Sequence, residues 1–402
     1  MHGGVKGIDY VEKAPTSADV AIVGGGVVGA ATAFYAAQAG LKPLLIERRP
    51  ALCTLTTPAS TGAFRLQFDN LEELELVRES VELFLNFQET TGQDLYDVDV
   101  RRPGYLFATT DENRASWQQE LVARQHGWGQ SDIELLTGDE VRARWPWIGE
   151  NVLQARFRAN DGFLDPKQLT LGLAAGSGAT VMTDTEVDGF TVRDGRIVAV
   201  ETSAGPISTE RAVIACGPLS GNLCHRIGLT LPIETVTRHK LVLPDLPEVP
   251  ADAPMTIDDD TGVHWRPALN GAYVLFTDPS TPPTPATDRV PGDPAFAFRV
   301  LAPGSPSSVG RIVPFWNEVW SKASANWMLQ SGQYTNTPDH RPLLGPLGPE
   351  GLFVNTGYSG HGIMGGPAGS RHLVDVMLGR VGADRNPFRV DRPFEERELD
   401  VL

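Results

Sequence analysis

The sequence predicts an α/β protein in which a domain with a parallel sheet is assembled from separate chain segments. A second, mainly β-sheet domain is expected between these segments. Two observations support this prediction: α/β patterns occur near both ends of the 402 residues, and a proline-rich stretch with β-like pieces lies between them. With 41% hydrophobic residues, the chain has enough apolar material for two cores.

The first element is a strand, a glycine turn, a helix and a second strand. Residues 20–23 are apolar and residues 24–29 read Gly-Gly-Gly-Val-Val-Gly. Residues 30–38 favour a helix, and residues 43–46 favour a buried strand that ends at Glu47. The order and spacing of these pieces are typical of a dinucleotide-binding βαβ unit.

Each glycine of the turn has a mechanical reason. Gly24 permits the tight turn, Gly26 lets a pyrophosphate approach the backbone at the helix N-terminus, and Gly29 lets helix and strand pack closely. Glu47 is placed to accept hydrogen bonds from ribose hydroxyls. These residues predict a dinucleotide site, and the pattern suits FAD and NAD alike.

The middle of the chain alternates between helical and β-like patterns. Helices are predicted over residues 71–89, 116–125 and 166–176. Strands are predicted over residues 104–108, 179–182, 186–193, 196–201 and 211–215. The last of these runs into Cys216-Gly217-Pro218, a small-residue turn at the carboxyl edge of the expected sheet, where a cofactor would lie. Residues 231–327 are predicted to form the mainly β-sheet domain, with a surface excursion over residues 279–294.

The last part returns to α/β signals. A strand over residues 351–357 is followed by a second GxGxxG pattern at residues 360–365 and a helix to residue 378. Residues 379–386 are polar and turn-like, so no strand with a terminal acid follows and a second dinucleotide site is not predicted. The positive end of this helix is instead expected to face a bound cofactor.

The charge and the cysteine content restrict the partners. A formal net charge of −16 argues against nucleic acid and against an anionic membrane surface. Three irregularly spaced cysteines favour neither a disulfide framework nor a metal site, and fit a reducing cytoplasm. Residues 20–40 are apolar enough to span a membrane, but the glycines at 24–26 and 29 interrupt them, which favours a buried strand and helix.

In this order and spacing, the motifs resemble the D-amino-acid oxidase superfamily, in particular its glycine oxidase, sarcosine oxidase and dimethylglycine dehydrogenase branches. The resemblance is carried by residues 24–47, by Asp-Gly-Phe-Leu-Asp-Pro at 161–166, by residues 212–218, and by Thr-Pro-Asp at 337–339 followed by Gly-Tyr-Ser-Gly-His-Gly at 357–362.

The resemblance implies a Rossmann-type FAD-binding domain built from the discontinuous residues 17–95, 155–228 and 328–390. It also implies an inserted substrate domain of the α+β type, based on an antiparallel sheet, over residues 96–154 and 229–327. It implies the following FAD contacts: Gly24, Gly26, Val28, Gly29, Glu47, Arg48, Ser60, Thr61, Gly62, Val187, Ala215, Gly217, Gly357, Ser359, Gly360, His361, Gly362, Ile363 and Met364.

The activity that the resemblance implies is oxidation of an amine or amino acid by hydride transfer to flavin N5. The imine formed is then hydrolysed, and O2 is reduced to H2O2. Two alternatives remain: a dehydrogenase that passes electrons to another acceptor, and a flavin-binding assembly or scaffold protein. The oligomeric state is left open.

This chain departs from the family at several positions. Gly332 aligns with the cysteine that tethers flavin in sarcosine oxidases, which predicts noncovalent FAD. The arginines of glycine oxidase align with Tyr334 and near Gly360, and neither is present. The lysine and arginine of sarcosine oxidase align with Met364 and Phe68. The oxygen-activating lysine aligns with Val274, so rapid reaction with O2 is in question.

These replacements favour a secondary amine or an N-substituted glycine as substrate. A carboxylate would need another cation, and the candidates are Arg65, Arg266 and Arg311, each of which can equally be a structural ion pair. Arg266 is the preferred ligand. Tyr334 and Met364 are candidate substrate contacts. The resemblance assigns the chemistry to flavin N5 and requires no strong protein base, because hydride transfer depends mainly on placement, so no residue is assigned as catalytic. Tyr334 and His361 are the candidates for a direct role.

Overall fold

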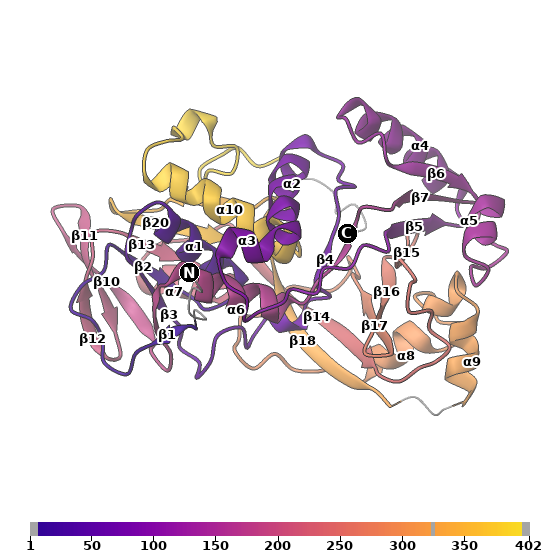
Figure 1. The fold of residues 1–402 in the computed structure, drawn as a ribbon, viewed down its shortest axis with the longest axis horizontal. Coiled ribbons are helices and arrows are strands. Elements are labelled where there is room, and N and C mark those ends of the chain that lie inside the picture. Colours follow the sequence, from indigo (N-terminus) through magenta and orange to yellow (C-terminus); the bar gives the residue numbers. More distant parts are fainter. Residues whose placement is uncertain (1–6, 323–325, 396–402) are drawn as a thin grey trace.

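The computed structural model describes residues 7–322 and 326–395. Within these ranges the molecule has two lobes that lie side by side along its longest axis (Figure 1). One lobe is built on a seven-stranded sheet and the other on an eight-stranded sheet. The predicted fold class, an α/β domain made of separated segments with an inserted α+β domain, is confirmed.

The seven-stranded sheet joins segments that are far apart in the chain. Its order is β1 (Asp9–Tyr10), β9 (Thr180–Met182), β3 (Pro43–Ile46), β2 (Val20–Val23), β13 (Ala212–Ile214), β20 (Leu352–Thr356) and β19 (Leu343–Pro346). All neighbours are parallel except β19 and β20. The carboxyl ends of β2, β13 and β20 therefore meet at one edge of the sheet.

Both faces of this sheet are covered, which explains its continuously apolar strands. Ile22 of β2 packs into a core with α1 (Val27–Gln38), α6 (Pro166–Ser177), α10 (Gly362–Met377) and α2 (Leu71–Leu85). Ala21 and Val23, which point the other way because side chains alternate along a strand, pack under a three-stranded sheet and α7 (Ser220–Arg226). That small sheet consists of β10 (Val187–Arg193), β11 (Arg196–Thr202) and β12 (Gly205–Ser208).

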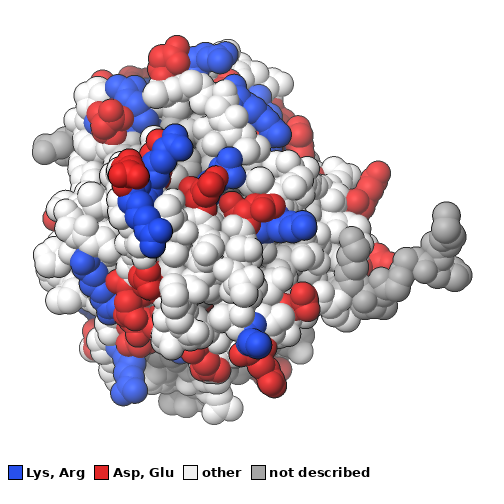
Figure 2. Space-filling model, turned by 90° about the vertical axis from the view of Figure 1, so that its left-hand side faces the viewer, with Lys and Arg blue, Asp and Glu red and all other residues white. Residues whose placement is uncertain are grey.

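Figure 2 shows the end of the molecule that carries this small sheet. Acidic and basic side chains are interspersed there among uncharged areas. The ion pairs of this region include Arg196–Glu350 and Arg226–Glu186, with nitrogen–oxygen distances of 2.6 and 2.8 Å. Exposed pairs of this kind contribute little to stability.

The eight-stranded sheet forms the second lobe. Its order is β18 (Met328–Asn336), β14 (Glu234–Leu243), β17 (Gly271–Phe276), β16 (Val263–Ala268), β15 (Met255–Asp258), β5 (Tyr105–Thr109), β7 (Gln154–Arg158) and β6 (Glu134–Thr137). Neighbours are antiparallel except β15 and β5. One face packs on α8 (Ala295–Leu301) and α9 (Phe315–Lys322) through Trp265 and Trp316.

Two strands lie across the predicted domain limits. The expected ranges 155–228 and 328–390 place most of β7 and the whole of β18 in the first domain, whereas both strands are hydrogen-bonded in the eight-stranded sheet. The reason is tertiary pairing, because β7 pairs with β5 and β6 and β18 pairs with β14.

The remaining α-helices and the remaining pair of strands complete the fold. The predicted helix over residues 71–89 is interrupted at Asn86, where α2 ends and α3 begins. The elements that remain are α3 (Phe87–Thr91), α4 (Glu112–Gly127), α5 (Gly138–Arg144) and the two-stranded sheet of β4 (Ala63–Phe64) and β8 (Gly162–Phe163).

Candidate functional site

A deep groove opens at the carboxyl edge of the seven-stranded sheet and extends to the second lobe. It holds about 1660 Å³ of space between protein atoms, including its open mouth. Its walls come from the glycine turn before α1, from residues 46–60, from the end of β13, from β14 and β18, and from residues 355–363. The groove is large enough for an extended ligand.

Glycine is required in the turn before α1 because the backbone there is crowded. A Cβ atom on Gly24 would lie 2.4 Å from the carbonyl oxygen of Ala215, and one on Gly29 would lie 1.8 Å from the carbonyl oxygen of Gly24. A Cβ on Gly26 would approach Thr57 Oγ1 to 3.2 Å. The Thr57 hydroxyl also accepts a hydrogen bond from the backbone N–H of Val27, at 3.3 Å. The cradle at the start of α1 is therefore open only because side chains are absent.

Glu47 lies where β3 ends, as expected. Its Oε2 atom accepts from the N–H of Gly25 at 2.7 Å, and its Oε1 atom accepts from the N–H of Arg49 at 2.8 Å. Each carboxylate oxygen can accept a further hydrogen bond. Glu47 is thus fixed in place with acceptor capacity left for hydroxyl groups in the groove.

A loop from the second lobe reaches this end of the groove. Asp288, in the proline-rich excursion, forms an ion pair with Arg48 at 3.0 Å, and its carbonyl oxygen accepts from Arg49 at 2.9 Å. The same excursion is bound to β14 through Thr284, whose N–H donates to the carbonyl of Thr235 at 2.7 Å. The excursion therefore links the two lobes beside the glycine turn.

The other end of the groove lies between α10 and the eight-stranded sheet. Tyr334 of β18 lines it, and a Cβ on Gly360 would lie 2.6 Å from the Tyr334 ring. Burial raises the pKa of Tyr334 despite the opposing effects of Arg238, Thr277 and Arg65. Residues 360–365 begin α10 rather than a second βαβ unit, and the positive end of that helix points at the groove.

His361 lies at the start of α10 but does not line the groove. Its Nδ1 atom lies 3.0 Å from Oε1 of Glu73, a buried residue of α2, and its ring meets the edge of Phe68. Burial would raise the pKa of Glu73, but His361, Asn70 and Arg65 outweigh it and hold that pKa below its ordinary value. The contact between His361 and Glu73 ties α10 to α2.

Most of the predicted contact residues lie together on the groove wall. The predicted residues that line it are Gly24, Gly26, Val28, Glu47, Arg48, Ser60, Val187, Ala215, Gly217, Tyr334, Gly357, Ser359, Gly360, Gly362 and Ile363. The predicted residues outside the lining are Gly29, Thr61, Gly62, Arg65, Arg266, Arg311, His361 and Met364. Gly29 nevertheless shapes the groove by its close packing on Gly24.

The three arginines proposed as carboxylate ligands lie in different surroundings. Arg65 is buried with its guanidinium over the rings of Phe68 and Phe107, at 4.7 and 5.7 Å. Arg266 donates to the carbonyl oxygens of Thr61 and Pro267, at 2.8 and 2.9 Å. Burial lowers the pKa of Arg266 to about 10. Arg266, the preferred ligand, thus holds the backbone of the 57–62 loop.

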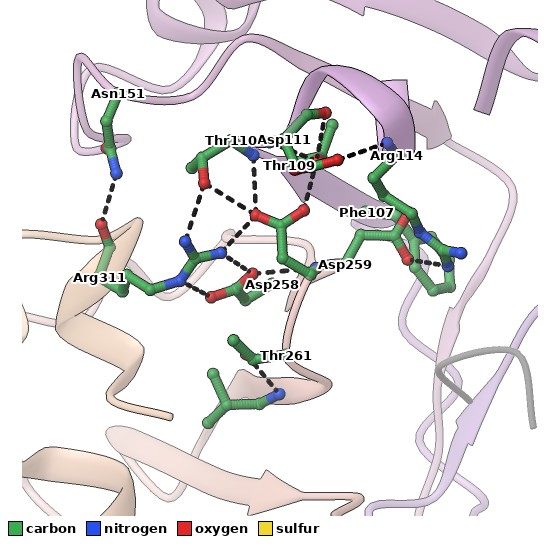
Figure 3. Close-up of polar contacts among 12 residues, drawn as sticks. Phe107, Thr109, Thr110, Asp111, Arg114, Asn151, Asp258, Asp259, Thr261 and Arg311 are labelled. Carbon is green, nitrogen blue, oxygen red and sulfur yellow. Dashed lines mark hydrogen bonds and ion pairs between the residues drawn. The ribbon is translucent and has the colours of Figure 1, made fainter. Parts of the chain in front are cut away.

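Arg311 belongs to an ion-pair network in the second lobe, away from the groove (Figure 3). Its guanidinium contacts the carboxylates of Asp258 and Asp260 and donates to the hydroxyl of Thr110 at 2.8 Å. The neighbouring Asp259 pairs with Arg114 at 2.9 Å. Arg311 therefore forms structural ion pairs, which was the alternative considered to binding a substrate carboxylate.

Two basic residues of β14 were not anticipated. Arg238 lines the groove, and Lys240 donates from Nζ to the carbonyl oxygens of Pro58 and Ser60, at 2.9 and 2.8 Å. The signal in the sequence is the basic run Arg238-His239-Lys240 inside a β-like stretch. Its charged side chains must find partners when the strand is buried.

Lys240 predicts a pH dependence of stability. Burial, with repulsion from Arg266, lowers the pKa of Lys240 to about 7, against 10.5 for the free side chain. Between these values the unfolded chain binds the extra proton, so the free energy of unfolding rises with pH from about 7 to 10. The expected slope is at most about 1.4 kcal/mol per pH unit.

Urea unfolding at pH 7, 8, 9 and 10 measures this slope. Lys240→Met is expected to flatten it, whereas Lys42→Met, at an exposed position, is expected to leave it unchanged. Equal slopes in the wild type and in Lys240→Met would show that Lys240 stays protonated throughout.

A sequence model of the family described as FAD dependent oxidoreductase (DAO) matches residues 19–376. The chain belongs to this family. The expected relationship to the D-amino-acid oxidase superfamily is thereby confirmed, and the protein is an FAD-dependent oxidoreductase.

Three relatives illustrate the similarity. The chain is 27% identical to FAD-dependent oxidoreductase domain-containing protein 1 of Xenopus laevis, over 90% of this chain and 80% of that protein. It is 26% identical to human mitochondrial dimethylglycine dehydrogenase, over 98% of this chain but only 46% of that protein. It is 26% identical to glycine oxidase of Pseudomonas aeruginosa, over 90% of this chain and 95% of that protein. The chain thus spans less than half of the dehydrogenase.

Solved structures share the fold. The L-proline dehydrogenase from P. horikoshii superimposes with a TM-score of 0.78 at 22% identity, covering 94% of this chain and 96% of that one. Among the residues that the structure describes here, no helix of this oxidoreductase is long and apolar enough to cross a membrane.

The groove of the oxidoreductase fits FAD. The cradle of Gly24 and Gly26 leaves room for a pyrophosphate at the N-terminus of α1, and Glu47 presents carboxylate oxygens to a ribose. The N-terminus of α10 and Tyr334 flank the far end, where the flavin ring would lie.

Proposed function

We propose that this oxidoreductase oxidises the C–N bond of a secondary amine or an N-substituted glycine. Bound FAD supplies the electron acceptor, with flavin N5 taking the hydride that leaves the carbon next to nitrogen. The imine released from the site is then hydrolysed to a carbonyl compound and an amine. The observation that carries the proposal is the continuity of the groove, which runs from the dinucleotide cradle to a partly buried aromatic end at Tyr334.

The residues at that end are suited to positioning rather than to proton transfer. Tyr334, Leu275 and Ile363 line it, and they exclude water from a substrate that reacts as the neutral amine. No protein base is needed when the amine nitrogen carries its own lone pair. His361 faces Glu73 instead, so its role is to hold the start of α10 in place.

The proposal includes noncovalent FAD. Gly332 has no side chain with which to form a bond, and a Cβ at that position would lie 3.1 Å from the Cβ of Ala59. We predict that all of the FAD appears in the supernatant when the yellow protein is precipitated with acid. The measurement is the flavin absorbance of supernatant and pellet, and flavin retained in the pellet contradicts the prediction.

We further propose that O2 accepts the electrons and is reduced to H2O2. The relatives include proteins named oxidases and proteins named dehydrogenases, so the acceptor needs its own test. Val274, which aligns with an oxygen-activating lysine, is fully buried in the core of the second lobe. Two cations, Lys240 and Arg266, lie on the sheet face that meets the 57–62 loop.

The three cysteines are free thiols, and Cys53 and Cys224 are buried. Thiols without disulfides suit a reducing compartment, which supports a cytoplasmic location. Fractionation of cells that contain the protein tests this part of the proposal.

Anaerobic mixing of the FAD-loaded protein with glycine, sarcosine and bulkier N-carboxymethyl compounds tests the reaction. Loss of flavin absorbance near roughly 450 nm, which is typical of flavins, is expected with at least one of them. Readmitting air then distinguishes an oxidase from a dehydrogenase, because only an oxidase regains its colour with release of H2O2. A protein whose flavin no amine reduces would contradict the proposal and favour a scaffold role.

A further inference from the structure

Arg238 is a buried cation in the wall of the groove. It belongs to β14, its side chain lines the cavity, and the residue is only 8% exposed. Its Nη1 atom donates to the carbonyl oxygen of Asp278 at 2.7 Å and to the hydroxyl of Thr281 at 2.9 Å. These two bonds fix the direction of the guanidinium.

The rest of the guanidinium is not satisfied by the protein. Within residues 7–322 and 326–395, the buried Nε atom of Arg238 has no hydrogen-bond partner, and no carboxylate lies within 4.0 Å of the guanidinium. A buried charge without a counter-ion is costly, and a buried donor without an acceptor adds to that cost. Both costs are removed when an anion enters the cavity beside Arg238.

Arg238 lies at the end of the groove near Tyr334 and α10, where the substrate is proposed to bind. Arg238 pairs with Gly332 across the two strands, so Arg238 and Tyr334 point to the same face of the sheet. The Cζ atom of Arg238 lies 5.7 Å from the centre of the Tyr334 ring. Tyr334 in turn contacts Gly360 at the start of α10. Arg238 therefore lies beside the aromatic group that closes the groove.

The other arginines of the groove wall are engaged. Arg226 pairs with Glu186 and Asp188, and Arg48 pairs with Asp288. Arg49 donates to Thr54 and to the carbonyl oxygen of Asp288. Arg238 differs from Arg48 and Arg226 because no carboxylate pairs with it, and it differs from Arg49 because Arg49 is only partly buried whereas Arg238 is buried.

We propose that Arg238 binds a carboxylate of the substrate. A planar guanidinium with adjacent free donors suits the two oxygens of a carboxylate. The proposed substrates then narrow from secondary amines in general to those that carry a carboxylate, such as N-substituted glycines. This inference rests on the proposed function for the identity of the substrate, but carboxylate binding itself is measured without turnover.

The experiment titrates the FAD-loaded protein with acetate and benzoate, and with the uncharged acetamide and benzamide, and follows the flavin absorbance spectrum. The proteins are the wild type, Arg238→Met, Arg238→Lys and the control Arg299→Met. Arg299 is a half-exposed residue of α8 in an ion pair with Asp293. Its loss is expected to leave binding unchanged.

We expect carboxylates, but not amides, to perturb the wild-type spectrum. Arg238→Met should weaken carboxylate binding by about 30-fold or more, as for removal of one partner of a buried charge pair. The carboxylate affinity of Arg238→Lys should lie between those of the wild type and Arg238→Met, because an ammonium group keeps the charge but lacks the planar arrangement of donors. All four proteins are expected to retain FAD.

Three results would overturn the proposal: equal carboxylate affinity in the wild type and Arg238→Met, equal affinity of the wild type for carboxylates and amides, and loss of FAD from both Arg238 variants while Arg299→Met keeps it. The last result would assign Arg238 to the cofactor. Failure of the proposed function is a separate outcome, in which no amine reduces the flavin although carboxylates still bind through Arg238.

Discussion

Gly29→Ala is expected to yield a protein that purifies without FAD. The added methyl group would lie 1.8 Å from the carbonyl oxygen of Gly24, which belongs to the backbone and has no rotamer by which to move away. The first turn of α1 must therefore shift, and with it the N–H groups that face the pyrophosphate. Overpacking of this kind also costs about 1–3 kcal/mol of stability.

The measurement is the ratio of flavin to protein absorbance after purification, together with the thermal unfolding midpoint. Gly127→Ala is the matched control, because a Cβ at Gly127 meets no atom within 4 Å. This control should bind FAD like the wild type. Full FAD content in Gly29→Ala would mean that α1 can move without disturbing the cradle.

Asp339→Asn is expected to lower the free energy of unfolding by about 3–5 kcal/mol, the cost of breaking a buried ion pair from one side. Arg392 donates to both carboxylate oxygens of Asp339, at 2.7 Å each, and both side chains are 5% exposed. Arg392 also donates to the carbonyl oxygens of Arg341 and Pro342. Asp339 thus anchors the segment after α10 to the loop before β19.

The same pair gives a pH dependence in the acid range. Burial alone would raise the pKa of Asp339, but the bond and charge of Arg392 hold that pKa below its ordinary value. The stabilisation is therefore present above the ordinary aspartate range and is lost as pH falls through the lowered value.

Urea unfolding at neutral pH tests the magnitude for Asp339→Asn. Asp391→Asn removes the carboxylate of an exposed pair with Arg389 and is expected to change stability by less than about 1 kcal/mol. An equally small effect at Asp339 would show that the buried pair contributes no net stability.

The parts of the fold that the sequence predicts well are those with local causes. The strand and turn at residues 20–29 follow from glycine geometry, and the strands of the seven-stranded sheet are recognisable because both faces are buried. Helix α6 begins at Pro166 and ends before Gly178, and both residues are local signals. These features depend on few distant contacts.

The parts that sequence reasoning placed differently depend on tertiary pairing. Arg266 and Arg311 both have the chemistry to bind a carboxylate. In the structure, however, Arg266 donates to backbone carbonyl oxygens, and Arg311 forms ion pairs with two aspartates. Arg238 lies in a strand whose side-chain direction depends on its pairing with β18. The pattern of residues along one strand does not reveal which lobe that strand joins, which also explains the shifted limits at β7 and β18.

The interleaved order of the strands has a consequence for synthesis on the ribosome. The walls of the groove include the carboxyl ends of β2, β13 and β20, and the last of these strands ends at Thr356. A nascent chain that has emerged only as far as β13 has the glycine turn and Glu47 but not α10, which covers the flavin end. We therefore expect cofactor loading to be a late step, because the groove is complete only after α10 has been synthesised.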